Sequence, residues 1–114
     1  MSFKERYELH YRKEESNKIM NKYPSRIPII VEKAKGCMLD DIDKKKYLAP
    51  KDLKVNQLLY VIRRRIKLGP EQSIFLLIGG ELCSSNTSLV EVYEKHADKD
   101  GFLYIKYASE NTFG

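Results

Sequence analysis

The chain has 114 residues, 42% hydrophobic and 32% charged, which is typical of a single globular domain with its own core. No apolar run approaches the ~20 residues needed to span a bilayer, and the polar start has no signal-peptide core, so we expect a cytosolic or nuclear protein. The formal charge is +5, divided into +9 over residues 1–67 and −4 over residues 68–114. This imbalance permits nucleic acid, anionic lipid or acidic peptide as a partner, and does not choose among them.

Residues that carry catalytic or metal chemistry are scarce. The two cysteines, Cys37 and Cys83, are too few for a disulfide framework and do not have metal-ligand spacing. The two histidines, His10 and His96, each stand alone. Because no nucleophile–base pair, phosphate loop or metal motif is present, an enzyme is the least favoured class, and we expect no cofactor and no metal.

The first part of the chain predicts helix followed by strand. Residues 3–22 contain no Gly or Pro and carry spaced apolar side chains, which favours one or two amphipathic helices. The helical stretch must end before Pro24, because the residue before a proline is displaced from the α region. Residues 29–33 are β-branched at their first three positions and predict a strand. In the following loop, residues 36–43, Leu39 and Ile42 are expected to point inward.

Residues 43–50, Asp-Lys-Lys-Lys-Tyr-Leu-Ala-Pro, join three lysines to a short apolar run. Pro50 cannot donate to a neighbouring strand, so this run is expected at the edge of a sheet. A free edge with cations at one end suits an extended peptide that has acidic residues beside hydrophobic anchors. The alternative is that the lysines only prevent edge-to-edge aggregation. Strand alternation places Tyr47 and Leu48 on opposite faces.

Residues 52–68 give the clearest helix, with Asp52 as its N-cap and Gly69-Pro70 as its stop. Four apolar residues form one narrow stripe that we assign to the core: Val55, Leu59, Ile62 and Ile66. Leu58, Val61 and Arg65 form a second stripe beside it. That second stripe is either a wider core face or one wall of a shallow groove.

The rest of the chain completes a small sheet. Residues 73–78 predict a strand buried on both faces, and Gly79-Gly80 a turn into a short return strand. Residues 88–97 predict a helix capped by Ser88 with Glu91 in a capping box. Residues 102–107 alternate as a last strand, followed by a polar tail. The order of these elements indicates an α+β fold, a ubiquitin-like β-grasp with two additional N-terminal helices. The single domain comprises a helical extension (1–24), a β-grasp core (25–107) and a flexible conjugation tail (108–114).

Three runs together resemble a known family: residues 22–33 (Lys-Tyr-Pro-Ser-Arg-Ile-Pro-Ile-Ile-Val-Glu-Lys), the lysine run 43–50, and residues 98–107 (Asp-Lys-Asp-Gly-Phe-Leu-Tyr-Ile-Lys-Tyr). With the ending Phe113-Gly114, they are similar to the autophagy ubiquitin-like modifiers, the GABARAP type especially. The resemblance covers essentially the whole chain. The chain departs from the family pattern at Ala49 and Leu58, where valine and phenylalanine are usual.

The resemblance implies conjugation of Gly114 to phosphatidylethanolamine, with activating and conjugating enzymes that form thioesters and a cysteine protease that releases the lipid. It also implies residence in the cytoplasm and, when lipidated, on the autophagosome membrane. Cargo receptors with an acidic-flanked aromatic-x-x-aliphatic motif would be bound there, and no nucleic acid is expected.

The family's peptide groove maps onto this chain residue by residue. The aromatic anchor's pocket would be lined by Glu15, Ile19, Pro28, Lys46, Leu48 and Phe102. The aliphatic anchor's pocket would be lined by Tyr47, Ala49, Pro50, Leu53, Leu58 and Val61. The ligand's acidic flank would meet Arg26, Lys44, Lys46 and Arg65.

A second hypothesis of another class is an unconjugated binder of nucleic acid or acidic protein surfaces. It would use the cations of residues 44–46 and 63–67, and predicts steeply salt-dependent binding. The sequence contains no aromatic RNA-binding motif or GXXG loop in its support.

Overall fold

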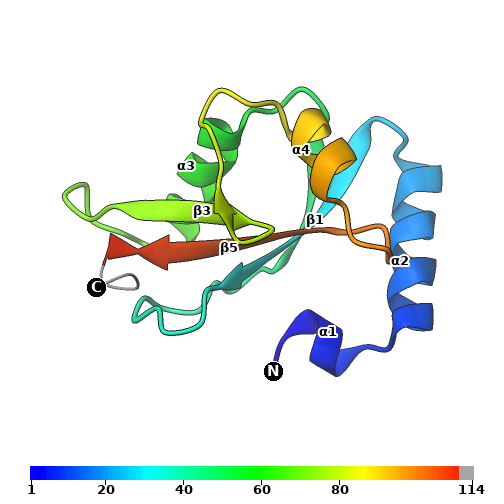
Figure 1. The fold of residues 1–114 in the computed structure, drawn as a ribbon, viewed down its shortest axis with the longest axis horizontal. Helices are drawn as coiled ribbons and strands as arrows, with labels where there is room; N and C mark the ends of the chain where they lie inside the picture. The colour runs from blue at the N-terminus through cyan, green and yellow to red at the C-terminus, as the bar shows by residue number, and fades with distance from the viewer. Residues whose placement is uncertain (111–114) are drawn as a thin grey trace.

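The computed structural model describes residues 1–110 as a five-stranded mixed sheet with helices on both faces (Figure 1). The elements, in order, are α1 (Phe3–Arg6), α2 (Leu9–Lys22), β1 (Arg26–Lys33), β2 (Lys46–Pro50), α3 (Val55–Arg65), β3 (Ile74–Ile78), β4 (Glu81–Leu82), α4 (Leu89–His96) and β5 (Leu103–Ser109). The strands are arranged β2-β1-β5-β3-β4, with parallel β1 and β5 in the middle. This topology confirms the predicted ubiquitin-like α+β fold, and both N-terminal helices are present.

The main core lies between the sheet and α3. Alternate residues of the two central strands, such as Ile29, Val31 and Ile105, are at most 1% exposed and face α3. Helix α4 packs on the same face, and Figure 1 shows both helices above the sheet. Strand β3 differs from the prediction of burial on both faces: it alternates between buried and half-buried residues.

Helix α3 is shorter than the predicted 52–68. Its N-cap is Lys54 rather than Asp52, because residues 51–54 form a turn that pairs with the start of α4: Leu89 N–H donates to the Leu53 carbonyl at 2.8 Å. At the other end the Lys67 and Leu68 N–H groups donate to the Arg64 and Arg63 carbonyls, a Schellman arrangement. Lys67 occupies its left-handed position with φ 56°, so the helix ends before Gly69.

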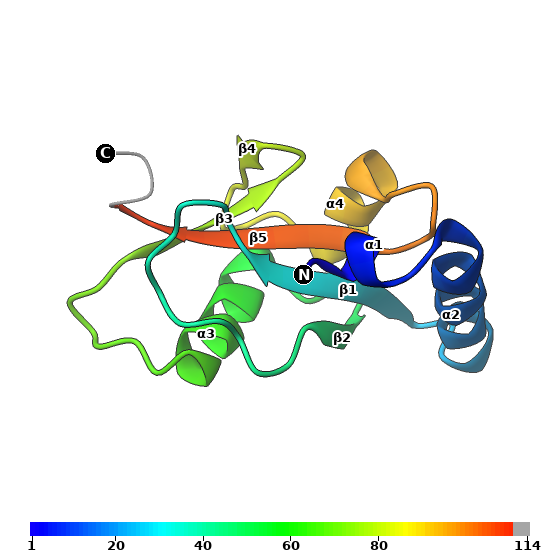
Figure 2. The same ribbon diagram turned by 90° about the horizontal axis from the view of Figure 1, so that it is seen from below.

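Helix α1 covers the opposite face of the sheet, which we call the α1 face, and α2 lies at the end of the sheet where β1 and β5 begin (Figure 2). Seen from below, α1 lies across β1 and β5 (Figure 2). Phe3 is buried there and meets Phe102 edge-to-face at 5.3 Å between ring centroids. The Phe3 N–H donates to the Glu32 carboxylate at 2.8 Å. A Ser2–Glu5 capping box begins α1, and α2 ends at Lys22 before Pro24, as predicted.

Strand β5 continues to Ser109, two residues beyond the predicted end of the last strand. Ala108 and Ser109 are buried and pair with Phe75 and Ile74 of β3, which extends the ladder into the expected tail. Within residues 1–110, no helix is both long and apolar enough to cross a membrane.

Candidate functional site

Strand β2 is an edge strand with free backbone groups, as the position of Pro50 predicted. The Val31 N–H donates to the Lys45 carbonyl at 2.7 Å, and antiparallel pairs alternate between bonded and non-bonded. The cross-strand pairs Pro28–Leu48 and Ile30–Lys46 are therefore the non-bonded ones, consistent with the missing N–H of Pro28. It follows that the amide groups of Lys46 and Leu48 point outward, where an added strand would pair.

The apolar residues predicted for the first pocket form two groups on the α1 face, Leu48 with Pro28 and Ile19 with Phe102. Leu48 is 36% exposed beside buried Pro28, its cross-strand partner. Ile19 of α2 packs against the cluster that contains Phe102. Because Phe102 itself is completely buried, it can form only the floor of this pocket.

A tyrosine pair that was not predicted as part of a site lies beside Glu15, one of the residues predicted for this pocket. Tyr7 and Tyr11 stack with their ring centroids 4.7 Å apart, and the Tyr11 hydroxyl donates to the Glu15 carboxylate at 2.8 Å. That hydrogen bond is the main reason why the pKa of Tyr11 is raised. Both rings, together with Lys46, line a cavity of about 330 Å³. The i,i+4 spacing of the two tyrosines was the available signal.

The second predicted pocket is closed in this structure. Tyr47, Ala49 and Leu58 belong to the main core and are no more than 8% exposed. For Leu58 the structure supports the wider core face rather than the groove wall: it faces the sheet beside Ile62, and Leu59 is the half-buried residue at the border. The residues with accessible surface are Pro50, Leu53 and Val61.

The four cations assigned to the acidic flank differ in their availability. Lys44 and Lys46 are exposed, with the Lys44 amine 5.1 Å from the centre of the Tyr47 ring. Arg26 donates to the Leu48 carbonyl at 3.2 Å. Arg65 makes a two-bond pair with the Asp43 carboxylate, 3.0 Å for each bond, and this pair lowers the pKa of Asp43. A ligand carboxylate would compete with Asp43 for Arg65.

A buried polar cluster holds α2 against the start of β5, and the sequence analysis missed it. Asp100 is 1% exposed, and its carboxylate accepts hydrogen bonds from the Phe102 N–H and the Tyr104 hydroxyl. Arg12 lies 3.5 Å from the same carboxylate, as an ion pair without hydrogen-bond geometry. Burial and then the Asp100 bond raise the pKa of Tyr104.

Gly101 makes the close packing of α2 possible. The Ser16 hydroxyl donates to the Asp100 carbonyl, and a Cβ at position 101 would meet the Ser16 side chain. Gly101 also has φ 92°, a conformation that favours glycine. The turn itself was predictable, whereas its contact with a helix more than eighty positions earlier was not.

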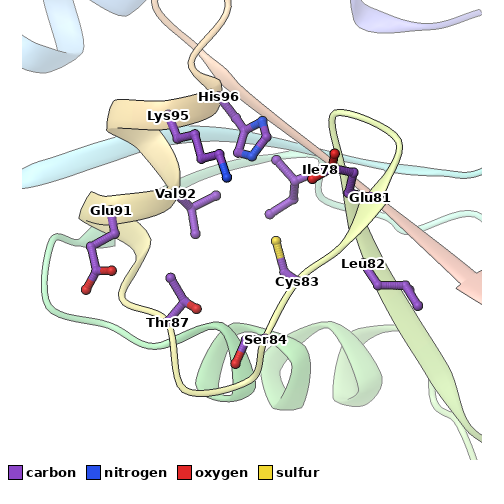
Figure 3. Close-up of a pocket in the computed structure, with 10 residues that line it drawn as sticks. All are labelled: Ile78, Glu81, Leu82, Cys83, Ser84, Thr87, Glu91, Val92, Lys95 and His96. Atoms are coloured by element: carbon purple, nitrogen blue, oxygen red, sulfur yellow. The ribbon is translucent and has the colours of Figure 1, made fainter.

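The surroundings of Cys83 do not activate its thiol as a nucleophile. Figure 3 shows Cys83 facing a cavity of about 280 Å³ between β4 and α4, with Lys95 and His96 on the opposite wall. Burial, and then Glu81, raise the pKa of the Cys83 thiol, so it remains protonated at neutral pH. No cluster of three or more metal-ligating side chains occurs among residues 1–110.

The arginine run proposed for nucleic-acid binding is partly engaged within the fold. Arg63 donates to the carbonyls of Gln72 and Gly69 at 2.6 and 2.9 Å, which clamps the loop after α3. Arg65 is paired with Asp43. Only Arg64 and Lys67 of this run, within the described part of the chain, lack an ion pair or side-chain hydrogen bond, so a continuous cationic stripe is not formed.

The fold and site together define the class: a ubiquitin-like α+β protein whose β2 strand lies at the edge of the sheet. Residues 11–114 match the family described as "Autophagy protein Atg8 ubiquitin like". Similar proteins include Autophagy-related protein 8a of Arabidopsis thaliana, 52% identical over 113 residues (99% of this chain, 93% of the relative). Autophagy-related protein 8 of Mycosarcoma maydis is 50% identical (99% and 96%). The chain belongs to the Atg8 family of autophagy ubiquitin-like proteins.

A solved structure agrees with this assignment. The crystal structure of Trypanosoma brucei ATG8 superposes with a TM-score of 0.94 at 34% identity, covering 100% of this chain and 98% of the other. The predicted conjugation residue, Gly114, lies outside the described residues.

Proposed function

We propose that this Atg8-family protein is conjugated through Gly114 to phosphatidylethanolamine and recruits cargo receptors to the autophagosome membrane. The chain supplies the carboxylate, and the activating and conjugating enzymes and the cysteine protease perform the chemistry. Family membership supports the conjugation, because the chain aligns with the family through its last residue. In this proposal the protein is a modifier and adaptor rather than an enzyme, and moves between cytoplasm and membrane.

The observation that carries receptor binding is the free edge of β2. The outward amides of Lys46 and Leu48 offer backbone pairing to an extended peptide, as in other strand-addition complexes. Leu48 offers apolar surface beside that edge, and Lys44 and Lys46 offer cations. An acidic-flanked aromatic-x-x-aliphatic peptide fits all three features. Its aliphatic anchor would enter beside Leu53 and Val61 and displace the core side chains beneath.

Two variants separate conjugation from peptide binding. Gly114→Ala should remain folded and bind the peptide normally, but gain no lipid in a reconstituted conjugation reaction, as intact mass measures. A Lys44→Glu/Lys46→Glu double variant should still accept lipid while its peptide affinity, measured by calorimetry, falls about tenfold or more. Normal lipidation of Gly114→Ala would contradict the conjugation proposal. Unchanged peptide affinity in the lysine variant would contradict the groove assignment.

A further inference from the structure

A concave basic surface lies on the α1 face, next to the cationic end of the peptide groove. Its Lys45 stands between Lys44 and Lys46 and also lines the cavity at the tyrosine pair. It is a depression of about 390 Å³ between the start of the chain, the end of β1 and the second half of β5. Four of its lining residues are lysines, which we call the lysine pocket: Lys33, Lys35, Lys45 and Lys106. Because they come from β1, the β1–β2 loop and β5, the fold brings them together rather than a run of sequence.

The acidic residues of this depression leave most of the lysine charge unpaired. The Glu32 carboxylate already accepts the Phe3 N–H at 2.8 Å, and Asp41 lies 3.4 Å from Lys33. Within residues 1–110, no ion pair or side-chain hydrogen bond engages Lys35, Lys45 or Lys106, and all three are exposed. A concave site with surplus positive charge attracts multiply coordinating anions such as phosphate groups.

The pocket also lies at the end of the molecule where the proposed lipid would be attached. Lys106 precedes Ser109, the last residue of β5, by three positions. Cys37 also lines the pocket, and its Sγ lies 4.0 Å from the Oγ of Ser109. Figure 2 shows the β1–β2 loop and the end of β5 at the same end of the molecule. In the sequence, Gly114 follows Glu110 by four positions.

We propose that the lysine pocket binds the phosphate groups of anionic phospholipids and so turns the α1 face toward the bilayer. Attachment at a single point limits the distance from the membrane but does not fix the orientation of the domain. Lysines near an anionic surface each strengthen binding about fivefold, enough for several of them to select one face. The orientation rests on the proposed conjugation, whereas the affinity of the pocket for lipid belongs to the unconjugated chain.

A second basic surface supplies a matched control. Arg64 and Lys67 border a cavity beside Tyr60 on α3, on the other side of the sheet. They are exposed and carry the same charge as a pair of pocket lysines. If membrane binding depended only on net charge, removing this pair would have the same effect as removing two pocket lysines.

The experiment is co-sedimentation of the full unconjugated chain with vesicles of phosphatidylcholine, with or without phosphatidylserine, at low ionic strength. We expect binding only when phosphatidylserine is present, and weaker binding as salt shortens the Debye length. Lys35→Gln/Lys106→Gln should weaken binding about tenfold or more, whereas Arg64→Gln/Lys67→Gln should change it less than about threefold. Thermal unfolding of both variants verifies that each remains folded.

Three results would overturn the proposal. Equal losses of vesicle binding in the two double variants would mean that binding depends on the net charge of the protein and not on the lysine pocket. Equal binding to phosphatidylcholine vesicles, whose phosphate groups are neutralised by choline, would remove the role of anionic lipid. If the lysine variant kept its vesicle binding but lost binding to a polyglutamate peptide, the pocket would be a peptide site. Because no conjugation step is involved, none of these results depends on whether Gly114→Ala blocks lipidation.

Discussion

The two faces of the sheet are held by different interactions. On the α3 face, apolar residues from β1, β5, α3 and α4 form one continuous core, and most of them are less than 5% exposed. On the α1 face, a small aromatic cluster around Phe3 and Phe102 is accompanied by charged and hydrogen-bonded contacts. The α3 face is stabilised by the large apolar area that it buries, whereas the α1 face depends on a few specific ion pairs and hydrogen bonds.

This difference separates the fold from the site. The α3 face makes the domain stable, and it encloses three of the residues predicted for the second pocket: Tyr47, Ala49 and Leu58. The α1 face contains Leu48, Ile19 and the tyrosine pair, where side chains remain accessible. We therefore expect the N-terminal layer to respond to single substitutions independently of the core, and the following changes test that expectation.

The largest effect is expected from Asp100→Ala. Removing this carboxylate leaves Arg12 buried without its ion pair. The free energy that holds α2 against the rest of the domain should therefore fall by about 3–5 kcal/mol. Hydrogen exchange should accelerate in Leu9–Lys22 while Val55–Arg65 remains protected. Asp52→Ala, an exposed residue near α3, is the control. Equal acceleration in both helices would mean that the two faces unfold as one unit.

A smaller effect on the α3 face distinguishes core from groove. Leu58→Ala should lower the free energy of unfolding by about 2–5 kcal/mol, because Leu58 is 2% exposed. Val61→Ala, at 39% exposure, should cost less than about 1 kcal/mol and act mainly on peptide affinity. Urea unfolding and calorimetry measure the two quantities. A cost below about 1 kcal/mol for Leu58→Ala would show that it is not a core residue.

The smallest effect concerns pH. Partial burial acts to raise the pKa of Asp98, but hydrogen bonds from the Lys4 amine and the Asp100 N–H outweigh it, and the pKa is lowered. A lowered folded-state pKa stabilises the fold above the usual aspartate value of about 3.9, and this contribution is lost as pH falls through the folded-state pKa.

Because the Lys4 side chain is half exposed, the contribution of this pair is at most about 1 kcal/mol. Lys4→Met should therefore lower stability slightly at neutral pH and flatten its decline in acid, as urea titrations at several pH values measure. If Lys4→Met left the loss of stability in acid unchanged, that loss would arise from other carboxylates.

Local patterns in the sequence were sufficient for most of the fold. Proline positions bounded α2 and placed β2 at an edge, and strand alternation put Tyr47 and Leu48 on opposite faces, as observed. These features depend on backbone chemistry within a few residues. The same locality explains why the sequence could not choose between core and groove for Leu58, since a helical wheel orders residues around an axis but does not say how wide the covering sheet is.

What the sequence by itself determined is therefore the order of elements, the edge strand with its lysines, and the family resemblance that the comparisons confirmed. Only the tertiary structure decided which charged side chains are paired within the fold: Arg12 with Asp100, Arg65 with Asp43, and Arg63 with carbonyls of the loop after α3. The same folding left Lys35 and Lys106 unpaired side by side around one depression. The physical reason is distance along the chain. Hydrophobic periodicity is a local property, whereas the energy of a charge depends on neighbours that only the folded chain supplies.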